Sequence, residues 1–203
     1  MTTPLTPIRL YQFPGSGNCH RVRLFLSVLG LPVEVMSMDR GSGQHKLENF
    51  LRINPFGQVP VIVDGDVTVA DSTAILVYLA KRYDDSGTWL PNDAVLAAQI
   101  QRWLSVATGE LAAGPMTLRA IARMGVGNND PVRARSIAER ILGLMEAHLA
   151  DRAYFVGDRP TLADIALYTY TALVPEGGLS LSPWPHIRAW LARIEALPGF
   201  VPV

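Results

Sequence analysis

The sequence predicts two domains, an α/β domain followed by an all-helical one. Up to Tyr83, segments with the two-residue period of strands alternate with segments that have the period of helices. Beyond a polar linker, the pattern is helical only. Hydrophobic residues make up 49% of the 203 residues and charged residues 18%, which is typical of a globular protein with a sizeable core. We place the domains at residues 1–83 and 93–203, with the linker at 84–92.

The first domain opens with alternating strand and helix signals. Alternation of apolar and polar residues predicts a strand over residues 8–13, and residues 14–17 form a turn. Apolar residues then recur at helical spacing over 22–29, and Gly30 with Pro32 ends this helix. A second strand is predicted over 33–38 and a short helix over 44–53.

A hairpin and a helix complete this domain. Two β-branched runs between Val59 and Val69 flank an Asp-Gly pair, which is a strong signal for a tight hairpin. Asp71 and Ser72 are suited to cap the helix that runs to about Tyr83. The predicted order is therefore βαβαββα, which is the order of a thioredoxin fold.

The second domain is predicted to be a helical bundle. One long helical pattern covers residues 94–124, and Gly114-Pro115 is expected to kink or break it. Thr161 and Asp164 have the spacing of a capping box that opens a later helix. The other predicted helices cover residues 137–148 and 187–194.

Charge and composition argue against several classes of function. Eighteen basic and 18 acidic residues give zero net charge, so no nucleic-acid partner is expected. No apolar run approaches the roughly 18 residues of a membrane helix, and the first residues lack the features of a signal peptide. The single cysteine, Cys19, excludes an internal disulfide, and a cytoplasmic location is expected. No metal is expected, because four histidines lack metal-ligand spacing: His20, His45, His148 and His186.

The segment from Ser16 to Cys19 lies between the first strand and the first helix, where a thioredoxin fold carries its Cys-x-x-Cys pair. A serine cannot form a disulfide, so dithiol exchange is not expected. What remains is a hydroxyl at a helix N-terminus, where free N–H groups and the helix dipole favour an anion. Lowering a thiol pKa by about two units needs roughly 2.7 kcal/mol. A hydrogen bond to a charged group supplies about 1.5–3 kcal/mol and the helix end about 0.3–1. Ser16 is therefore suited to hold a bound thiol as thiolate, as donor and not as nucleophile.

Other interpretations of this segment remain open. Ser16 is a common N-cap residue and could serve only as a cap. Cys19 falls within the predicted helix, where a buried structural role is favoured over catalysis. Tyr11, near the end of the first strand, is a less favoured alternative to Ser16.

Four motifs, in order along the chain, are similar to those of one family. Ser16–Leu24 resembles the serine-type motif of cytosolic glutathione S-transferases, of a bacterial-like kind. Asn54–Val61 is the family's most recognisable run, and Asp71–Ile75 resembles its Glu/Asp-Ser-x-Ala-Ile motif. Thr161–Ala166 matches the capping box of its helical domain. The resemblance covers nearly the whole chain and implies glutathione as co-substrate, a homodimer and a role in detoxification.

The resemblance also implies roles for single residues in glutathione binding. Ser16 would donate to the glutathione sulfur, and the backbone of Val59, followed by a cis Pro60, would pair with the cysteinyl part. Asp71 and Ser72 would hold the γ-glutamyl end. The remaining contacts would come from His45 and Lys46 near the glycine carboxylate and from Gln58. Without the resemblance, capping explains Asp71 and Ser72, and a solvated face explains His45 and Lys46. The sequence has Asp71 where many relatives have Glu or Gln.

The expected reaction is conjugation of the glutathione thiolate to an electrophilic small molecule. A glutathione-dependent isomerase or peroxidase, or a non-catalytic glutathione-binding protein, remain alternatives. Four residues are candidates to contact the hydrophobic electrophile, although buried aromatic and methionine side chains more often belong to the core: Phe13, Trp103, Thr108 and Met116.

Overall fold

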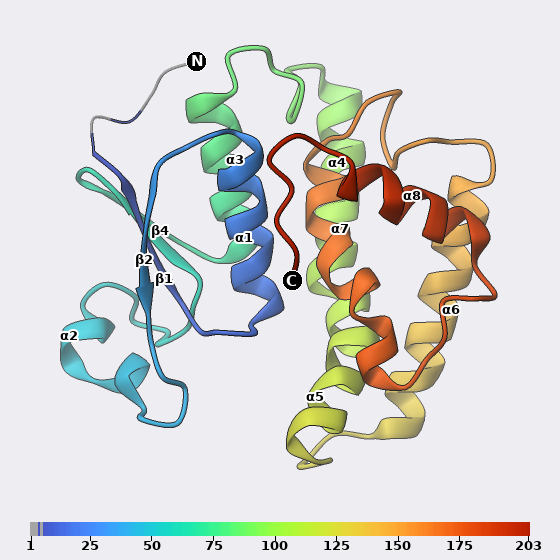
Figure 1. Cartoon of the computed structure of the whole chain (residues 1–203), viewed down its shortest axis with the longest axis horizontal. Helices are drawn as coiled ribbons and strands as arrows, with labels where there is room; N and C mark the ends of the chain where they lie inside the picture. The colour runs from blue at the N-terminus through green and yellow to red at the C-terminus, as the bar shows by residue number, and fades with distance from the viewer. Residues whose placement is uncertain (1–3, 5) are drawn as a thin grey trace. The chain divides into compact units, whose positions relative to one another are not determined.

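The computed structural model describes residue 4 and residues 6–203, and these divide into two compact units (Figure 1). The first unit contains the described residues up to Gly87 together with Leu197–Val203, and the second is Thr88–Ala196. The sequence assigned the last seven residues to the helical domain. The contacts of the backbone group them with the first unit instead.

A four-stranded mixed sheet forms the centre of the first unit. Its order is β2-β1-β3-β4, with β1 parallel to β2 and antiparallel to β3, and with β3 and β4 joined as a hairpin. The predicted thioredoxin-like fold is therefore confirmed. The strands are β1 (Ile8–Gln12), β2 (Val33–Ser37), β3 (Val61–Asp64) and β4 (Val67–Ala70).

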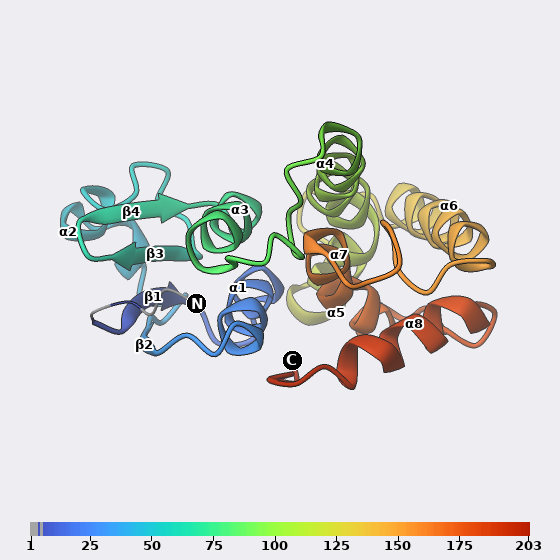
Figure 2. The same cartoon turned by 90° about the horizontal axis from the view of Figure 1, so that it is seen from above.

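Helices α1 (Gly17–Val28) and α3 (Ser72–Tyr83) cover one face of this sheet, and α2 (Glu48–Leu51) lies on its other side (Figure 2). The apolar stripes of α1 and α3 pack against the sheet and exclude water from it. Each fully buried aliphatic or aromatic side chain stabilises such a core by roughly 1.5–3 kcal/mol. The fully buried members include Ile8, Leu10, Val22, Phe25, Ile62, Ile75 and Leu79.

The single helix expected over residues 44–53 is two short pieces in the structure. A 3₁₀ turn covers Gln44–Lys46, and α2 follows only from Glu48. Leu47 between them has extended backbone angles, φ −79° and ψ 152°, which a continuous helix does not allow.

The last residues of the chain lie along α1. The Nε2 atom of His20 donates to the Val201 carbonyl at 2.9 Å, and Arg23 donates to the Pro202 carbonyl at 3.1 Å. Gly199 has a φ of +80°, and a Cβ atom there would lie 2.5 Å from the carbonyl oxygen of Ser27. A glycine is therefore required where the tail crosses the end of α1.

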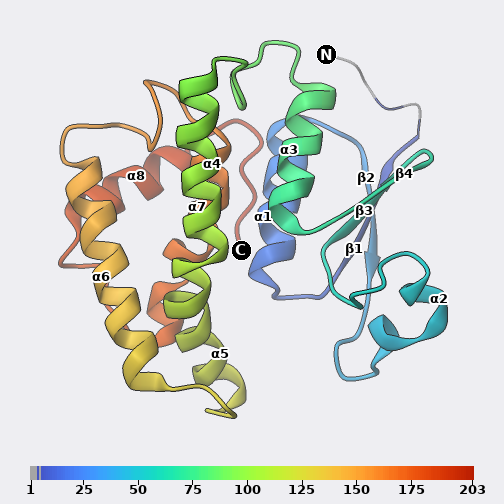
Figure 3. The ribbon, with the colours of Figure 1, turned by 180° about the vertical axis from the view of Figure 1, so that it is seen from behind.

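The second unit is all-helical, as predicted (Figure 3). Its central helix, α7, is buried from Leu162 to Thr171. The predicted capping box is present at Thr161, and the Asp164 carboxylate also accepts from Trp190 Nε1 at 2.9 Å and Phe155 N at 3.1 Å. Burial raises the pKa of Asp164 to about 6, against the lowering effect of these bonds. The helices are α4 (Ala94–Thr108), α5 (Thr117–Met124), α6 (Pro131–Leu149), α7 (Leu162–Ala172) and α8 (Pro185–Glu195).

The break expected at Gly114-Pro115 is a π-helical segment, Ala112–Met116, between α4 and α5. A proline removes one backbone donor, and the wider turn frees a carbonyl. The Thr117 hydroxyl donates to the carbonyl of Ala112, within this segment, at 2.8 Å.

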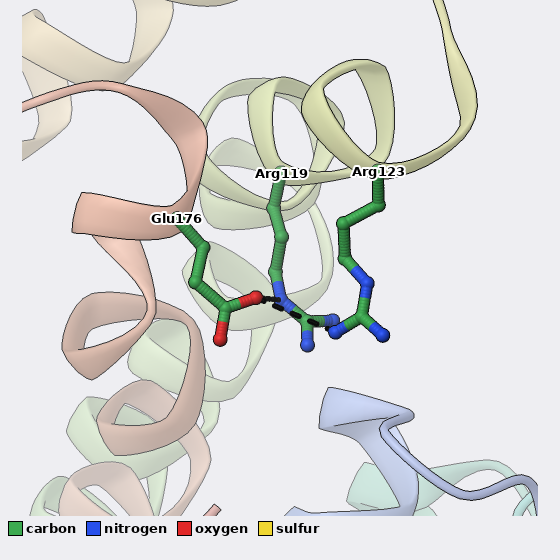
Figure 4. A network of polar contacts seen from close by, with 3 residues as sticks. All are labelled: Arg119, Arg123 and Glu176. Carbon is green, nitrogen blue, oxygen red and sulfur yellow. Dashed lines mark hydrogen bonds and ion pairs between the residues drawn. The ribbon is translucent and has the colours of Figure 1, made fainter.

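Two arginines of α5 share one carboxylate (Figure 4). Arg119 Nε lies 2.7 Å from Glu176 Oε2, and Arg123 Nη1 lies 3.4 Å from the same oxygen. Glu176 belongs to the 3₁₀ helix Val174–Gly177. This ion-pair network ties that turn to α5, and no pattern in the sequence indicated it.

None of the helices in the described residues is long and apolar enough to cross a membrane.

Candidate active site

Ser16 is the N-cap of α1. Its backbone is extended, with φ −77° and ψ 120°, and its Oγ accepts from the backbone N–H of Cys19 at 3.4 Å. A serine oxygen that accepts one bond still carries a proton that rotates freely. The half-buried hydroxyl can therefore cap the helix and donate to a ligand at the same time, so the two interpretations of Ser16 are compatible.

Cys19 lies one turn further along α1 and is 1% exposed. Burial raises the pKa of its thiol, while the Ser16 hydroxyl, the Phe13 backbone and the positive charges of Arg40 and Arg23 act in the opposite direction. A protonated, inaccessible thiol is a poor nucleophile. Its surroundings favour the structural role over the catalytic one.

A cavity of about 310 Å³ lies beside the N-termini of α1 and α3. This volume is at the small end of ligand-binding pockets in proteins. Five residues that the resemblance assigns to glutathione line it: Gln58, Val59, Pro60, Asp71 and Ser72. The expected cis peptide bond between Val59 and Pro60 is present. Four further residues complete the wall: Asn18, Asn54, Phe56 and Ala70.

Asp71 is the N-cap of α3 and has an unusual backbone. Its φ is +75°, and no other non-glycine residue in the described part of the chain has a positive φ. One carboxylate oxygen, Oδ1, accepts from the backbone N–H groups of Thr73 at 2.8 Å and Ala74 at 3.0 Å. Backbone strain of this kind costs about 1–3 kcal/mol and is concentrated at functional sites.

Ser72 is the first residue of α3 and is 3% exposed. Its Oγ accepts from Nη1 of Arg21 at 2.8 Å, and the same nitrogen lies 3.4 Å from Oδ1 of Asn18. Sequence reasoning missed Arg21 and Asn18. A signal for Arg21 was available, since it falls at helical spacing with Leu24 and Phe25 on the buried stripe of α1.

The loop before Val59 is shaped by Asn54, a third residue to which the sequence assigned no role in the site. The Asn54 side chain is 4% exposed, donates to the Gln58 carbonyl at 2.8 Å and accepts from Phe56 N at 3.2 Å. Gly57 has a φ of +58°, and a Cβ atom there would lie 2.8 Å from the carbonyl oxygen of His45, so a glycine is required at this point of the loop. The loop therefore lies against the segment that contains His45 and Lys46.

His45 and Lys46 take part in this arrangement in different ways. Lys46 Nζ donates to the Phe56 carbonyl at 3.3 Å. The rings of His45 and Phe13 pack in a T-shaped arrangement with 5.0 Å between their centres. The guanidinium carbon of Arg40 lies 4.8 Å from the centre of the Phe13 ring. Phe13 is thereby 7% exposed, which leaves little of its surface for an electrophile.

Neither Tyr11 nor Trp103 is among the residues that line the 310 Å³ cavity. Tyr11 packs on Phe50 with 5.7 Å between ring centres, and both line a different cavity of about 730 Å³. This placement does not favour Tyr11 over Ser16. Trp103 is 8% exposed and packs against Phe155 at 4.6 Å and His148 at 4.9 Å, within the core of the second unit.

The last two candidates for the electrophile have accessible surface. Thr108, at the end of α4, is exposed, and its hydroxyl donates back to the Leu104 carbonyl at 3.2 Å. Met116 is half-buried at the end of the π-helical segment.

Comparisons with known proteins match both halves of the chain. The model of the glutathione S-transferase N-terminal domain matches residues 6–81, and that of the C-terminal domain matches residues 120–198. Glutathione S-transferase 3 of Zea mays is 36% identical in an alignment 205 residues long, gaps included, which covers 97% of this chain and 92% of that relative. Human glutathione S-transferase theta-2 is 31% identical, over 88% of this chain and 76% of its own length.

Solved structures agree with the sequence comparisons. A glutathione S-transferase from Pseudomonas fluorescens Pf-5 superposes with a TM-score of 0.90 and 33% identity, over 97% of this chain and 98% of that one. A glutathione transferase homolog from Lodderomyces elongisporus, solved with two GSH per subunit, has a TM-score of 0.85 and 28% identity, with 96% of both chains covered. The chain therefore belongs to the glutathione S-transferase family and is an enzyme of that family.

Proposed function

We propose that this enzyme conjugates the thiolate of glutathione to an electrophilic small molecule and that Ser16 stabilises the thiolate. The observation that carries the proposal is the position of Ser16, whose hydroxyl caps α1 and keeps a proton to donate. The donated hydrogen bond and the positive end of α1 together supply roughly 2–4 kcal/mol, enough for a thiol pKa shift of about two units.

The 310 Å³ cavity is the proposed site of the γ-glutamyl group. Its α-carboxylate would accept from the Ser72 hydroxyl and from N–H groups at the N-terminus of α3. Its ammonium would pair with the Asp71 carboxylate, of which one oxygen already caps the helix. The same Asp71 can therefore act as a cap and bind a ligand.

The rest of the tripeptide would run along the neighbouring loop. The backbone of Val59 would pair with the cysteinyl residue as an added strand does, with the thiol near Ser16. The glycine carboxylate would be held by His45 and Lys46, beside Gln58. The contacts of the 45–46 segment with the Phe56–Gly57 turn support this course.

The reaction would then need little further chemistry from the protein. The thiol loses its proton to solvent, and the Ser16 hydroxyl donates to the resulting thiolate. The sulfur attacks the electrophilic carbon, forms a C–S bond, and a halide or other leaving group departs with the electron pair of the broken bond. We propose that Thr108 and Met116, which have accessible surface, contact the electrophile.

Replacing Ser16 tests the proposal. Ser16→Ala should lower turnover of a haloaromatic substrate at least about tenfold, because roughly 1.4 kcal/mol or more of thiolate stabilisation is lost. Glutathione affinity, measured by calorimetry, should change little. Assays with hydroperoxide and maleyl substrates, run on the same samples, distinguish peroxidase and isomerase activity from conjugation.

Ser16→Asp is the matched control, because aspartate caps a helix as well as serine does but has no proton to donate at neutral pH. Full activity in Ser16→Asp would mean that capping is the whole role of Ser16. Full activity in Ser16→Ala would exclude Ser16 as the thiolate donor.

We also propose that the enzyme is a homodimer, as the resemblance implies. Phe56 is 79% exposed, and in the proposed dimer a second copy would cover it. Light scattering should give twice the 22.1 kDa mass of one chain. Phe56→Ser should shift that mass towards the monomer.

A further inference from the structure

A buried arginine lies behind the wall of the 310 Å³ cavity. Arg21 is 1% exposed, although it carries a full charge. Removing an arginine from water is costly unless the interior supplies hydrogen bonds in good geometry. A charge kept at such a cost, directly behind a ligand pocket, suggests that the pocket uses it.

The contacts of Arg21 reach two different walls of that pocket. Nη1 donates to Ser72 Oγ at 2.8 Å and approaches Asn18 Oδ1 at 3.4 Å. Ser72 belongs to α3 and Asn18 to the first turn of α1, and both line the cavity. One guanidinium therefore connects the two helix N-termini beside the cavity.

These contacts determine what Ser72 and Asn18 offer to a ligand. Because the serine oxygen accepts from Arg21, its own proton is left to point elsewhere. Because the amide oxygen of Asn18 faces Arg21, its NH₂ group is the end left for the cavity. Both side chains are thus oriented as donors, and the positive charge behind them favours an anion in front of them.

We propose that Arg21 is a positioning residue that orients Ser72 and Asn18 towards the α-carboxylate of the γ-glutamyl group. Through these two donors it makes the enzyme selective for thiols that carry this carboxylate. The inference rests on the proposed binding of glutathione in the 310 Å³ cavity. It adds Arg21 and Asn18 to the residues that control binding there.

Calorimetry with two ligands tests the proposal. One ligand is glutathione, and the other is its analogue with 4-aminobutyryl in place of γ-glutamyl, which lacks only the α-carboxylate. The wild-type enzyme should bind glutathione more tightly than the analogue. In Arg21→Met, the affinity for glutathione should fall roughly 10- to 100-fold, as for a lost charge-assisted hydrogen bond, while that for the analogue stays unchanged.

Controls separate positioning from folding. Arg23→Met makes the same change two residues later on α1, where the guanidinium contacts the Pro202 carbonyl, and should leave both affinities unchanged. Asn18→Ala keeps the buried charge in place and should still weaken glutathione binding selectively, which covers the case in which Arg21→Met does not fold. In steady-state assays, KM for glutathione should rise in both variants with little change in kcat, because Ser16 is untouched.

The outcomes distinguish the two proposals. Equal losses for both ligands in Asn18→Ala or in folded Arg21→Met would reduce Arg21 to a structural residue and overturn the inference alone. So would a wild-type enzyme that binds the two ligands equally. A wild-type enzyme that binds neither ligand would overturn the proposed function and this inference with it.

Discussion

Ser16 caps α1 and Cys19 lies in its first turn, but the two side chains have opposite surroundings. Ser16 is half-buried at the helix end, whereas Cys19 is 1% exposed and the pKa of its thiol is raised by burial. Reactivity of a cysteine follows its thiolate fraction and its access to solvent, and both are low here. The thiol of this enzyme should therefore be inert, and the reacting sulfur should come from the ligand.

Cys19→Ala is predicted to keep at least half of the wild-type conjugating activity, because the thiol takes no part in the reaction. The cost should fall on stability, since a small buried side chain is shortened. Labelling of native wild-type enzyme with a thiol reagent should be slow and should accelerate on unfolding. Rapid labelling of the native enzyme, with loss of activity in step, would contradict this account.

Among single residues, the sequence identified the helix caps, because a cap is recognised from the few residues that follow it. Ser16, Asp71 and Thr161 all precede helical patterns, and each caps a helix in the structure. Arg21 has the spacing of the buried stripe of α1, but a charged residue in a helix is normally assigned to the exposed face. Its partner Ser72 is 51 positions away along the chain, so only the packing of α1 on α3 brings the pair together.

The sequence predicted the boundaries of helices and strands wherever a local turn or cap signal marks them. The hairpin around Asp64-Gly65 and the capping box of α7 are where their sequences predict them. The helix expected over 44–53 is interrupted at Leu47. The residues before Leu47 lie against the Phe56–Gly57 turn, which is not a helix. No periodicity within the segment itself reveals such an interaction.

The π-helical segment depends on the absence of a side chain at Gly114. A Cβ atom there would lie 2.7 Å from the backbone nitrogen of Ala138 in α6, so the two backbones are in direct contact. Gly114→Ala should therefore lower the free energy of unfolding by about 1–3 kcal/mol, although alanine favours helices more than glycine does. Urea denaturation followed by circular dichroism measures the change.

Gly143→Ala is the matched control for this substitution. Gly143 also lies inside a helix, α6, but a Cβ atom there would meet nothing within 4 Å. Alanine should stabilise this position by up to about 1 kcal/mol, because it gains helix propensity at no steric cost. If both variants were stabilised, the close approach of Gly114 to Ala138 would not exist in solution.

In the molecule as a whole, two buried groups, Asp164 and His20, make the stability of the folded protein depend on pH in opposite directions. Burial raises the pKa of Asp164 to about 6, and burial lowers the pKa of His20 to about 4. Between pH 4 and 6 the folded protein keeps the Asp164 proton that the unfolded chain has lost, so this group makes stability fall as pH rises. Between pH 4 and 6.5 the unfolded chain binds a proton at His20 that the folded protein does not, so this group makes stability rise with pH.

These two contributions should nearly cancel in the wild-type enzyme, since each pKa differs from its ordinary value by about two units, or roughly 3 kcal/mol. Single variants should reveal each one. With His20→Gln, which keeps a donor for the Val201 carbonyl, stability should decrease from pH 4 to 6 relative to wild type.

With Asp164→Asn, stability should increase from pH 4 to 6.5 relative to wild type. This variant should be less stable at every pH, because an amide cannot accept all of the hydrogen bonds that the carboxylate accepts. Thermal melting across this range measures both slopes. Parallel curves for the two variants and the wild type would show that neither group is held in the protonation state that its burial dictates, and that the tail on α1 and the capping box of α7 are open to water.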